Sequence, residues 1–395
     1  MTDAHADDIR HRLDDLVERL LAHHDPAMTE PGRFWAAQFD LGLAWVHAPG
    51  GLGGVGAPAD WQDHVDERLA QAGAPSNALV NFVGLGIVAP ALLQHGTGAQ
   101  QARLRPLFSC EEIWCQLFSE PGAGSDLLSL STRAERDGDE WVVHGHKVWT
   151  TLGHIARWGM LVARSDPESS RRQGLTFFLL DMAAPGVEVR PLRQISGEAE
   201  FNEVLLEGVR IPESMRLGEV GGGWSVLLST LMNERSHNGD LAKRPRGLGP
   251  IAQATRLWAQ QPGRDPVRRD ALARAWSDAE VLRLTAGRSL ARRHAGAAGP
   301  EGSILKLATG LLPQQVYELC ADLRGAEGML ISDYEMTQPE LMGVGNMGDG
   351  TEQIDLTKAL LNSRSATIGG GTTEIQRNTI GERVLGLPKD PPAPG

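Results

Sequence analysis

The middle of the chain, from about residue 115 to residue 217, contains short apolar segments that follow the two-residue period of β-strands. Val187 and Val189 alternate with polar neighbours, and so do Val204 and Leu206. Turn-forming residues such as glycine, proline and aspartate separate the segments. The other segments of strand length are Glu140–Val143, Gly159–Ala163 and Leu175–Asp181. Many short strands at this spacing predict a compact antiparallel barrel or sandwich.

The regions before and after this stretch repeat at helical spacing instead. Leu13, Val17 and Leu20 mark a helix near the N-terminus, and the apolar stretch Val80–Leu93 indicates a buried helix. After the strands, a helix is predicted from the spacing of Trp224, Leu227, Leu228, Leu231 and Met232. Later helices are expected at Asp270–Arg292, Ser303–Leu323, Gln353–Ser363 and Thr373–Leu385.

The order of helices, strands and helices predicts an α+β protein. A chain of 395 residues is long enough for two or three domains. We expect an N-terminal helical domain over residues 1–114, a central antiparallel β-barrel over 115–217, and a C-terminal, four-helix-bundle-like domain over 218–395.

Charge and composition exclude several classes of partner. A net charge of −12 argues against nucleic acid as the main partner. No apolar run is long enough for a membrane span, and the polar N-terminus lacks the apolar core of a signal peptide. Three cysteines provide no disulfide framework, so a cytoplasmic location is expected. His154 and the pair His23 and His24 have no partners at metal-ligand spacing, so no metal is predicted.

Four segments resemble the acyl-CoA dehydrogenase family, and they occur in the family's order. Such short motifs are weak one by one, but together they span most of the chain. They are SEPGAGSD at Ser119–Asp126, DGDEWVVHGHKVWTT at Asp137–Thr151, a segment at Phe201–Trp224 that ends in GGGW, and IGGGTTEIQRNTIGERVLGLP at Ile368–Pro388. The resemblance implies a bound FAD and the helix–barrel–helix fold.

The resemblance also implies which residues contact FAD. By similarity, the Ser119 hydroxyl bonds the flavin ring, Ser125 contacts the pyrophosphate, and Trp149 packs on the isoalloxazine with Thr151 near N5. Glycine amides can approach a phosphate closely, which suits such a loop. On the residues alone, an ordinary turn is the better interpretation of the loop, and a core position is the better interpretation of Trp149. The full set implied in these two motifs is Phe118, Ser119, Gly124, Ser125, Trp149 and Thr151.

The position of the catalytic base departs from the commonest family pattern. Many family members place a glutamate just before the Gly-Thr of the C-terminal signature, but the matching residue here is Gly370. A second family location, on the helix after the barrel, matches Glu234. Glu234 lies seven residues after Leu227 and three after Leu231, so it continues the predicted apolar stripe. A carboxylate on such a stripe suits a general base, although a pair with Arg235 is the alternative.

Other residues of the C-terminal signature have two interpretations. The backbone N–H of Gly370 is expected to donate to the thioester oxygen, as the resemblance implies. Thr372 and Glu374 match positions near the ribityl or adenosine end of FAD, and Thr372 is also a candidate helix cap. The family's FAD-contacting Arg-x-x-Phe-Gly segment is absent, and Arg264 or Arg268 is a loose substitute.

These features predict an FAD-dependent acyl-CoA dehydrogenase that forms a trans-2-enoyl thioester. By resemblance, its partners are an acyl-CoA substrate, an electron-transfer flavoprotein and further copies of itself in a homotetramer or dimer. The alternatives are an oxidase or hydroxylase of the same fold, an enzyme for carrier-protein-bound acyl groups, and a catalytically silent flavin-binding subunit. The acyl chain is left open.

Overall fold

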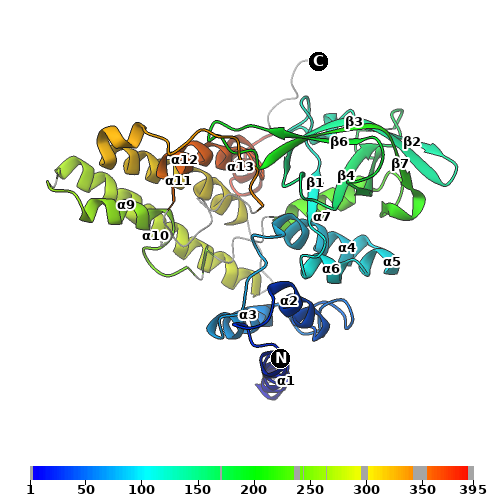
Figure 1. The fold of residues 1–395 in the computed structure, drawn as a ribbon, viewed down its shortest axis with the longest axis horizontal. Helices are drawn as coiled ribbons and strands as arrows, with labels where there is room; N and C mark the ends of the chain where they lie inside the picture. The colour runs from blue at the N-terminus through cyan, green and yellow to red at the C-terminus, as the bar shows by residue number, and fades with distance from the viewer. Residues whose placement is uncertain are drawn as a thin grey trace. The chain divides into compact units, whose positions relative to one another are not determined.

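The computed structural model describes residues 3–169, 171–234, 241–242, 244–263, 265–294, 301–340 and 354–389. It divides into two compact units, which are described separately (Figure 1). The first unit contains mainly residues 1–192 and 200–230, and the second contains the later residues together with 193–199. No helix in the described part of the chain is long and apolar enough to cross a bilayer.

Six α-helices precede the strands in the first unit. Leu13, Val17 and Leu20 are fully buried along one face of α1, as their spacing predicts. The predicted helix at Val80–Leu93 appears as a π-helical segment, Gly84–Val88, continued by α4. The helices are α1 (Asp3–His23), α2 (Pro31–Asp40), α3 (Gln62–Gln71), α4 (Ala89–His95), α5 (Gly98–Gln101) and α6 (Leu104–Phe108).

Eight strands form one sheet in the order β6-β7-β3-β2-β4-β5-β8, with β1 beside β4. Most pairings are antiparallel as predicted, but β1 and β2 each pair with β4 in parallel. Among the described residues no pairing joins β6 to β8, so the sheet is open. The strands are β1 (Trp114–Leu117), β2 (Arg133–Asp137), β3 (Glu140–Thr151), β4 (Trp158–Arg164), β5 (Leu175–Asp181), β6 (Val187–Leu192), β7 (Phe201–Pro212) and β8 (Arg216–Leu217).

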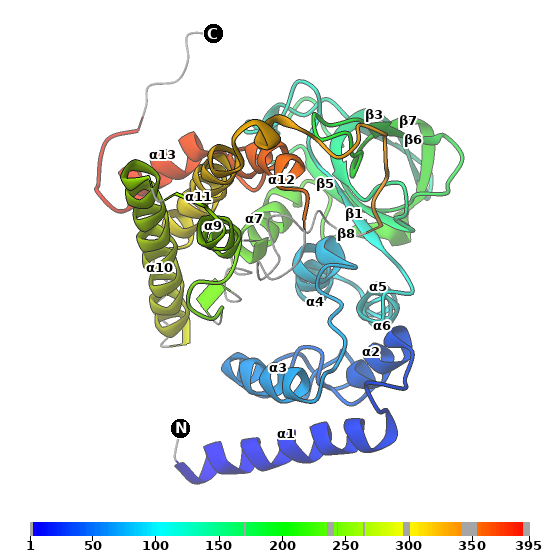
Figure 2. The ribbon, with the colours of Figure 1, turned by 60° about the vertical axis from the view of Figure 1, so that its left-hand side comes forward.

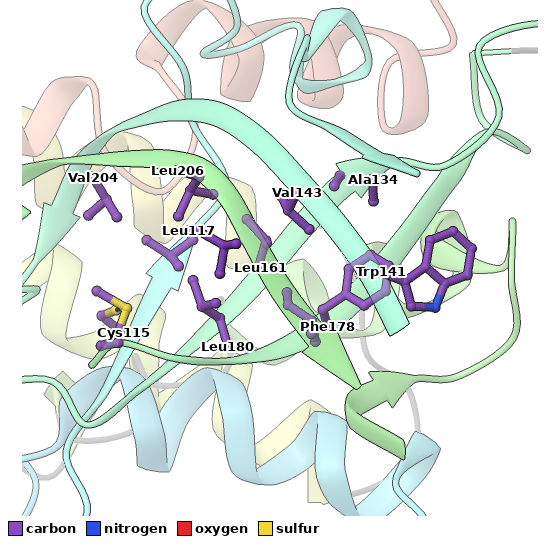
Figure 3. Packing of buried hydrophobic residues seen from close by; sticks show 14 residues of the cluster. Cys115, Leu117, Ala134, Trp141, Val143, Leu161, Phe178, Leu180, Val204 and Leu206 are labelled. Atoms are coloured by element: carbon purple, nitrogen blue, oxygen red, sulfur yellow. Dashed lines mark hydrogen bonds between the residues drawn. The ribbon is translucent and has the colours of Figure 1, made fainter. Parts of the chain in front are cut away.

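A cluster of buried hydrophobic residues lines the inner face of the sheet. Figure 3 shows Trp141 of β3 beside Phe178 of β5, and their ring centroids lie 5.4 Å apart in an edge-to-face arrangement. Alternate residues of six strands supply most of the rest of the cluster, because successive side chains of a strand point to opposite faces. The core therefore fixes which residues of β3 point inward and which point outward.

The second unit is helical. α10 and α11 pack side by side with α9 against them, around a core that includes Ala254, Ala286, Leu305 and Tyr317 (Figure 2). Asp355 begins α12 by accepting hydrogen bonds from the N–H groups of Thr357 and Lys358. The helices are α9 (Pro250–Ala259), α10 (Pro266–His294), α11 (Glu301–Arg324), α12 (Leu356–Asn362) and α13 (Thr373–Arg383), while α7 (Gly223–Glu234) links the units.

Candidate flavin and acyl-thioester site

The SEPGAGSD segment forms an open loop at the end of β1. Phe118 is buried edge-on against Phe177, with ring centroids 5.3 Å apart, and Ser119 is half-buried. From Pro121 to Asp126 the loop is exposed except at Ala123. A side chain added at Gly122 or Gly124 would meet no atom within 4 Å, so this backbone has room for a large ligand.

A buried ion pair lies directly beneath this loop. The Lys147 Nζ donates to Glu120 Oε1 at 2.8 Å and to the Phe118 carbonyl at 3.0 Å, and the Lys147 side chain is fully buried. The Glu120 carboxylate also accepts from the Ser131 N–H and hydroxyl, at 2.6 and 2.7 Å, and from the Thr132 N–H at 2.9 Å. Every buried polar atom of this pair therefore has a partner.

The pair shifts the titration of both groups. Burial alone would raise the pKa of Glu120, but the Lys147 charge and the hydrogen bonds lower that pKa to about 2. Burial lowers the pKa of Lys147 to about 8, because the Glu120 charge offsets only part of the desolvation cost. Neither residue was predicted from the sequence to belong to the site. A signal for Lys147 was present in the sequence, because an even number of residues separates it from the buried Trp141 and Val143, so all three point to the same face of β3.

Trp149 occupies a strained and exposed position on β3. Its φ is +62°, a left-handed value that large side chains rarely adopt, and 58% of the residue is exposed. A register shift between Lys147 and Thr150 in the pairing with β7 marks a β-bulge here. The bulge turns Trp149 out of the core, where its ring meets Phe201 edge-on at 6.0 Å. The core position that the residues alone favour for Trp149 is wrong, and its packing on the isoalloxazine stays a prediction.

Hydroxyl groups with free hydrogen-bonding capacity occur in the loop and on the two residues that follow Trp149. Within the described residues, the hydroxyls of Ser119, Ser125 and Thr151 form no hydrogen bond, and the buried Thr150 hydroxyl also lacks a partner. An apolar ring wall, free hydroxyls and an open glycine loop are the groups that an isoalloxazine and a pyrophosphate require. The residues present in the first unit therefore fit FAD.

The helix that carries the predicted base begins in the first unit. Along α7, Val226, Leu227 and Thr230 are buried, whereas Leu228 is 43% exposed, so the prediction that Leu228 faces the core was wrong. Ser229 accepts or donates a 2.9 Å hydrogen bond with His95 of α4. Glu234 is the last residue of α7, and its side chain lies outside the described part of the structure.

The C-terminal signature forms a glycine turn before α13 in the second unit. Gly370 and Gly371 have φ values of +67° and +92°, which favour glycine at both positions. A side chain at Gly371 would lie 2.6 Å from the amide of Gln376, which is buried beneath the turn. Lys306 of α11 donates to the Ala366 carbonyl at 2.7 Å, and this hydrogen bond joins α11 to the backbone just before the turn.

Thr372 is the N-cap of α13, since its hydroxyl accepts from the Ile375 N–H at 3.2 Å. The predicted capping role is confirmed, while contacts of Thr372 and the exposed Glu374 with FAD stay predictions. Of the two substitutes for the missing arginine motif, Arg264 lies outside the described residues. Arg268 is partly exposed on α10 and lies 3.9 Å from Asp265.

Comparison with known proteins identifies the family to which this helical and β-sheet fold belongs. The models of the acyl-CoA dehydrogenase N-terminal, middle and C-terminal domains match residues 3–111, 115–209 and 221–385. The chain belongs to the acyl-CoA dehydrogenase family, a family of flavin-dependent oxidoreductases.

Individual relatives extend this result. The acyl-CoA dehydrogenase IpdE1 of Mycobacterium tuberculosis is 37% identical over 354 residues, which cover 88% of this chain and 86% of IpdE1. The solved Tcur3481–Tcur3483 steroid ACAD is 25% identical with a TM-score of 0.71, over 96% of this chain and 98% of that one. The ChsE4–ChsE5 complex of Mycobacterium tuberculosis is 25% identical with a TM-score of 0.69, over 96% and 98% of the two chains.

The strain at Trp149 predicts a trade between stability and flavin binding. Trp149→Asn places a residue that tolerates left-handed backbone at this position, so the protein without FAD should be as stable as the wild type or more stable, by up to about 1 kcal/mol. FAD binding should weaken, because the ring wall is lost. Thermal unfolding and flavin fluorescence measure the two effects. Trp149→Phe, which keeps a ring, is the control, and unchanged FAD binding in Trp149→Asn would contradict the assignment.

The lowered pKa of Glu120 predicts a pH-dependent contribution to stability. A carboxyl with a pKa of about 2, against its ordinary value of 4.5, stabilises the fold above about pH 4.5 and loses that effect as the pH falls toward 2. The stability advantage of the wild type over Glu120→Gln should therefore be constant near neutral pH and shrink below about pH 4.5. Urea unfolding followed by Trp fluorescence measures it, and an advantage independent of pH over this range would rule out the ionised pair.

Proposed function

We propose that this acyl-CoA dehydrogenase binds FAD along the Ser119–Ser125 loop and oxidises an acyl-CoA thioester between Cα and Cβ. The observation that carries the proposal is the exposed, strained Trp149 beside the free hydroxyls of Ser119 and Thr151. The strained backbone turns the ring away from the core toward an edge contact with Phe201 and leaves most of it exposed, so a ligand that covers the ring would account for the strain. The Ser119 and Thr151 hydroxyls would orient the ring system.

FAD, when bound, supplies an acceptor for the hydride that leaves Cβ. The chain supplies the base, and we assign Glu234 to the removal of the α-proton. Glu234 follows the buried Leu227 by seven residues and the buried Thr230 by four, so the register of α7 supports a position on its inner face. The Gly370 N–H would donate to the thioester oxygen and stabilise the charge that develops there as the proton leaves.

Left-handed backbone at residue 370 supports the displacement of the base. A glutamate with a φ of +67° would carry a strain of about 1–2 kcal/mol, which glycine does not. Any residue except proline supplies a backbone N–H, so this donor remains while the carboxylate is contributed by another element. The two assignments therefore support each other.

We propose a bulky, ring-containing acyl group as the first substrate class to test. The likeness to the Tcur3481–Tcur3483 steroid ACAD favours this class over short straight chains. That protein and the ChsE4–ChsE5 complex are solved structures that are each named for two different proteins. We therefore propose a hetero-oligomer as an alternative to the expected homotetramer or dimer. We further propose that electrons pass to an electron-transfer flavoprotein in the cytoplasm, and that Thr372 and Glu374 contact FAD.

Anaerobic mixing with a panel of acyl-CoAs tests both the activity and the substrate class. The wild type should lose the yellow absorbance of its flavin with at least one thioester, and a steroid-derived side-chain thioester should react faster than straight chains. Retained FAD without bleaching by any thioester would contradict the dehydrogenase proposal. Rapid reoxidation of the bleached protein by oxygen, with peroxide formed, would favour an oxidase.

Glu234→Gln tests the base. The amide is close in size but cannot take the α-proton, so the rate of flavin bleaching should fall by about 10²–10⁴-fold while FAD content is unchanged. Glu219→Gln, at an exposed glutamate just before α7, is the matched control and should bleach at the wild-type rate. Equal rates in Glu234→Gln and the wild type would move the base to another residue.

A further inference from the structure

The buried pair of Glu120 and Lys147 lies where the flavin loop meets β3. We infer that Glu120 and Lys147 are positioning residues for FAD, which hold Ser119 and Trp149 at a fixed separation. The inference rests on the proposed FAD site. Neither residue needs to touch the cofactor, because each acts through the backbone that carries the contacting groups.

Three successive residues of the loop are joined to β3 just before Trp149. The Lys147 ammonium donates to the Phe118 carbonyl at 3.0 Å and to the Glu120 carboxylate at 2.8 Å. Between these contacts, the Val148 N–H donates to the Ser119 carbonyl at 2.9 Å. The loop backbone on both sides of Ser119 is therefore bonded to the strand immediately before the bulge that presents Trp149.

Glu120 also closes the loop and joins it to the next strand. Its backbone exchanges two 3.0 Å hydrogen bonds with Ala123, which forms the turn from which Gly124 and Ser125 follow. Its carboxylate accepts three hydrogen bonds from Ser131 and Thr132, directly before β2. Glu120 thus connects the loop to β2 and β3, the two paired strands beneath it.

The segment that donates to Glu120 approaches β3 closely at Gly145. A side chain at Gly145, two residues before Lys147, would lie 2.2 Å from the Thr132 hydroxyl. Thr132 is fully buried, so the segment that donates to Glu120 packs directly on the backbone of β3. This close approach constrains where Ser131 and Thr132, which donate to Glu120, lie relative to Lys147.

The energetics of buried charges favour a positioning role over a purely stabilising one. Two charges removed from water lose solvation that their mutual attraction seldom more than repays, and a neutral pair of similar volume is often as stable or more stable. A polar pair does define its geometry more sharply than apolar side chains, because its hydrogen bonds fix distance and direction. A site for a large cofactor binds more tightly when the contacting groups are held in place, since small displacements of these groups weaken binding.

The double variant Glu120→Gln with Lys147→Met separates positioning from stability. It removes both charges at nearly constant volume, and the single glutamine oxygen can accept from the Thr132 N–H or from the Ser131 N–H, but not from both. We expect thermal stability without FAD close to that of the wild type, and FAD released at least about tenfold more readily on dilution of the holoprotein, followed by flavin fluorescence. The absorption bands of the remaining bound flavin should shift, because the loop no longer holds Ser119 in place.

Arg210→Gln is the matched control. It removes an exposed charge that pairs with Asp137 and Glu140, each at 2.9 Å, at the far end of β3 from the loop. FAD release from this variant should equal that of the wild type. If the double variant also releases FAD as slowly as the wild type, with unchanged absorption, the positioning role is overturned while FAD binding stands.

A wild type that holds no FAD would overturn the proposed function itself, and is distinguishable from the preceding outcome. If the double variant is unstable, Glu120→Asp replaces it, since this variant keeps both charges and withdraws the carboxylate by one methylene. Faster FAD release from a stably folded Glu120→Asp supports positioning, and wild-type release overturns it.

Discussion

The pairing of β3 with β7 is the constraint on which the rest of the sheet unit depends. It joins two strands of twelve residues across the middle of the sheet and places Trp141 and Val143 in the core. Because side chains alternate along a strand, this register also decides that Lys147 points inward. The bulge that follows breaks the alternation and turns Trp149 outward. Along this one strand, the core residues Trp141 and Val143 are followed by the buried Lys147 and then by the exposed Trp149.

Much of this architecture was predictable from the sequence. Apolar patterns at helical spacing located α1, α7, α10 and α11, because a long pattern reflects one buried face. The strand Leu175–Asp181 was located as a short apolar run between turn residues, and its side chains are buried on both faces. The short helices α2, α3 and α9 were not singled out. The exposure of Leu228 was not visible either, since periodicity gives the direction of a helix face but not the width of the surface that covers it.

The candidate site was predictable only in part, for a similar physical reason. Ser119, Trp149 and Thr151 came from resemblance, and the structure adds the strain and the free hydroxyls that make them suitable for a flavin. The Glu120–Lys147 contact joins residues 27 positions apart. No local pattern specifies which acid meets a buried lysine, because the encounter depends on how the loop folds back over the sheet.

The glycine turn at residues 370 and 371 has a consequence for how such enzymes diverge. Because the backbone at residue 370 is left-handed, a carboxylate regained there by mutation would carry about 1–2 kcal/mol of strain. If a lineage moved its base to α7 and its turn then became left-handed at residue 370, that backbone would oppose the return of the base to the turn. The backbone geometry would then keep the base on α7, whatever selection acts on the choice of acyl substrate.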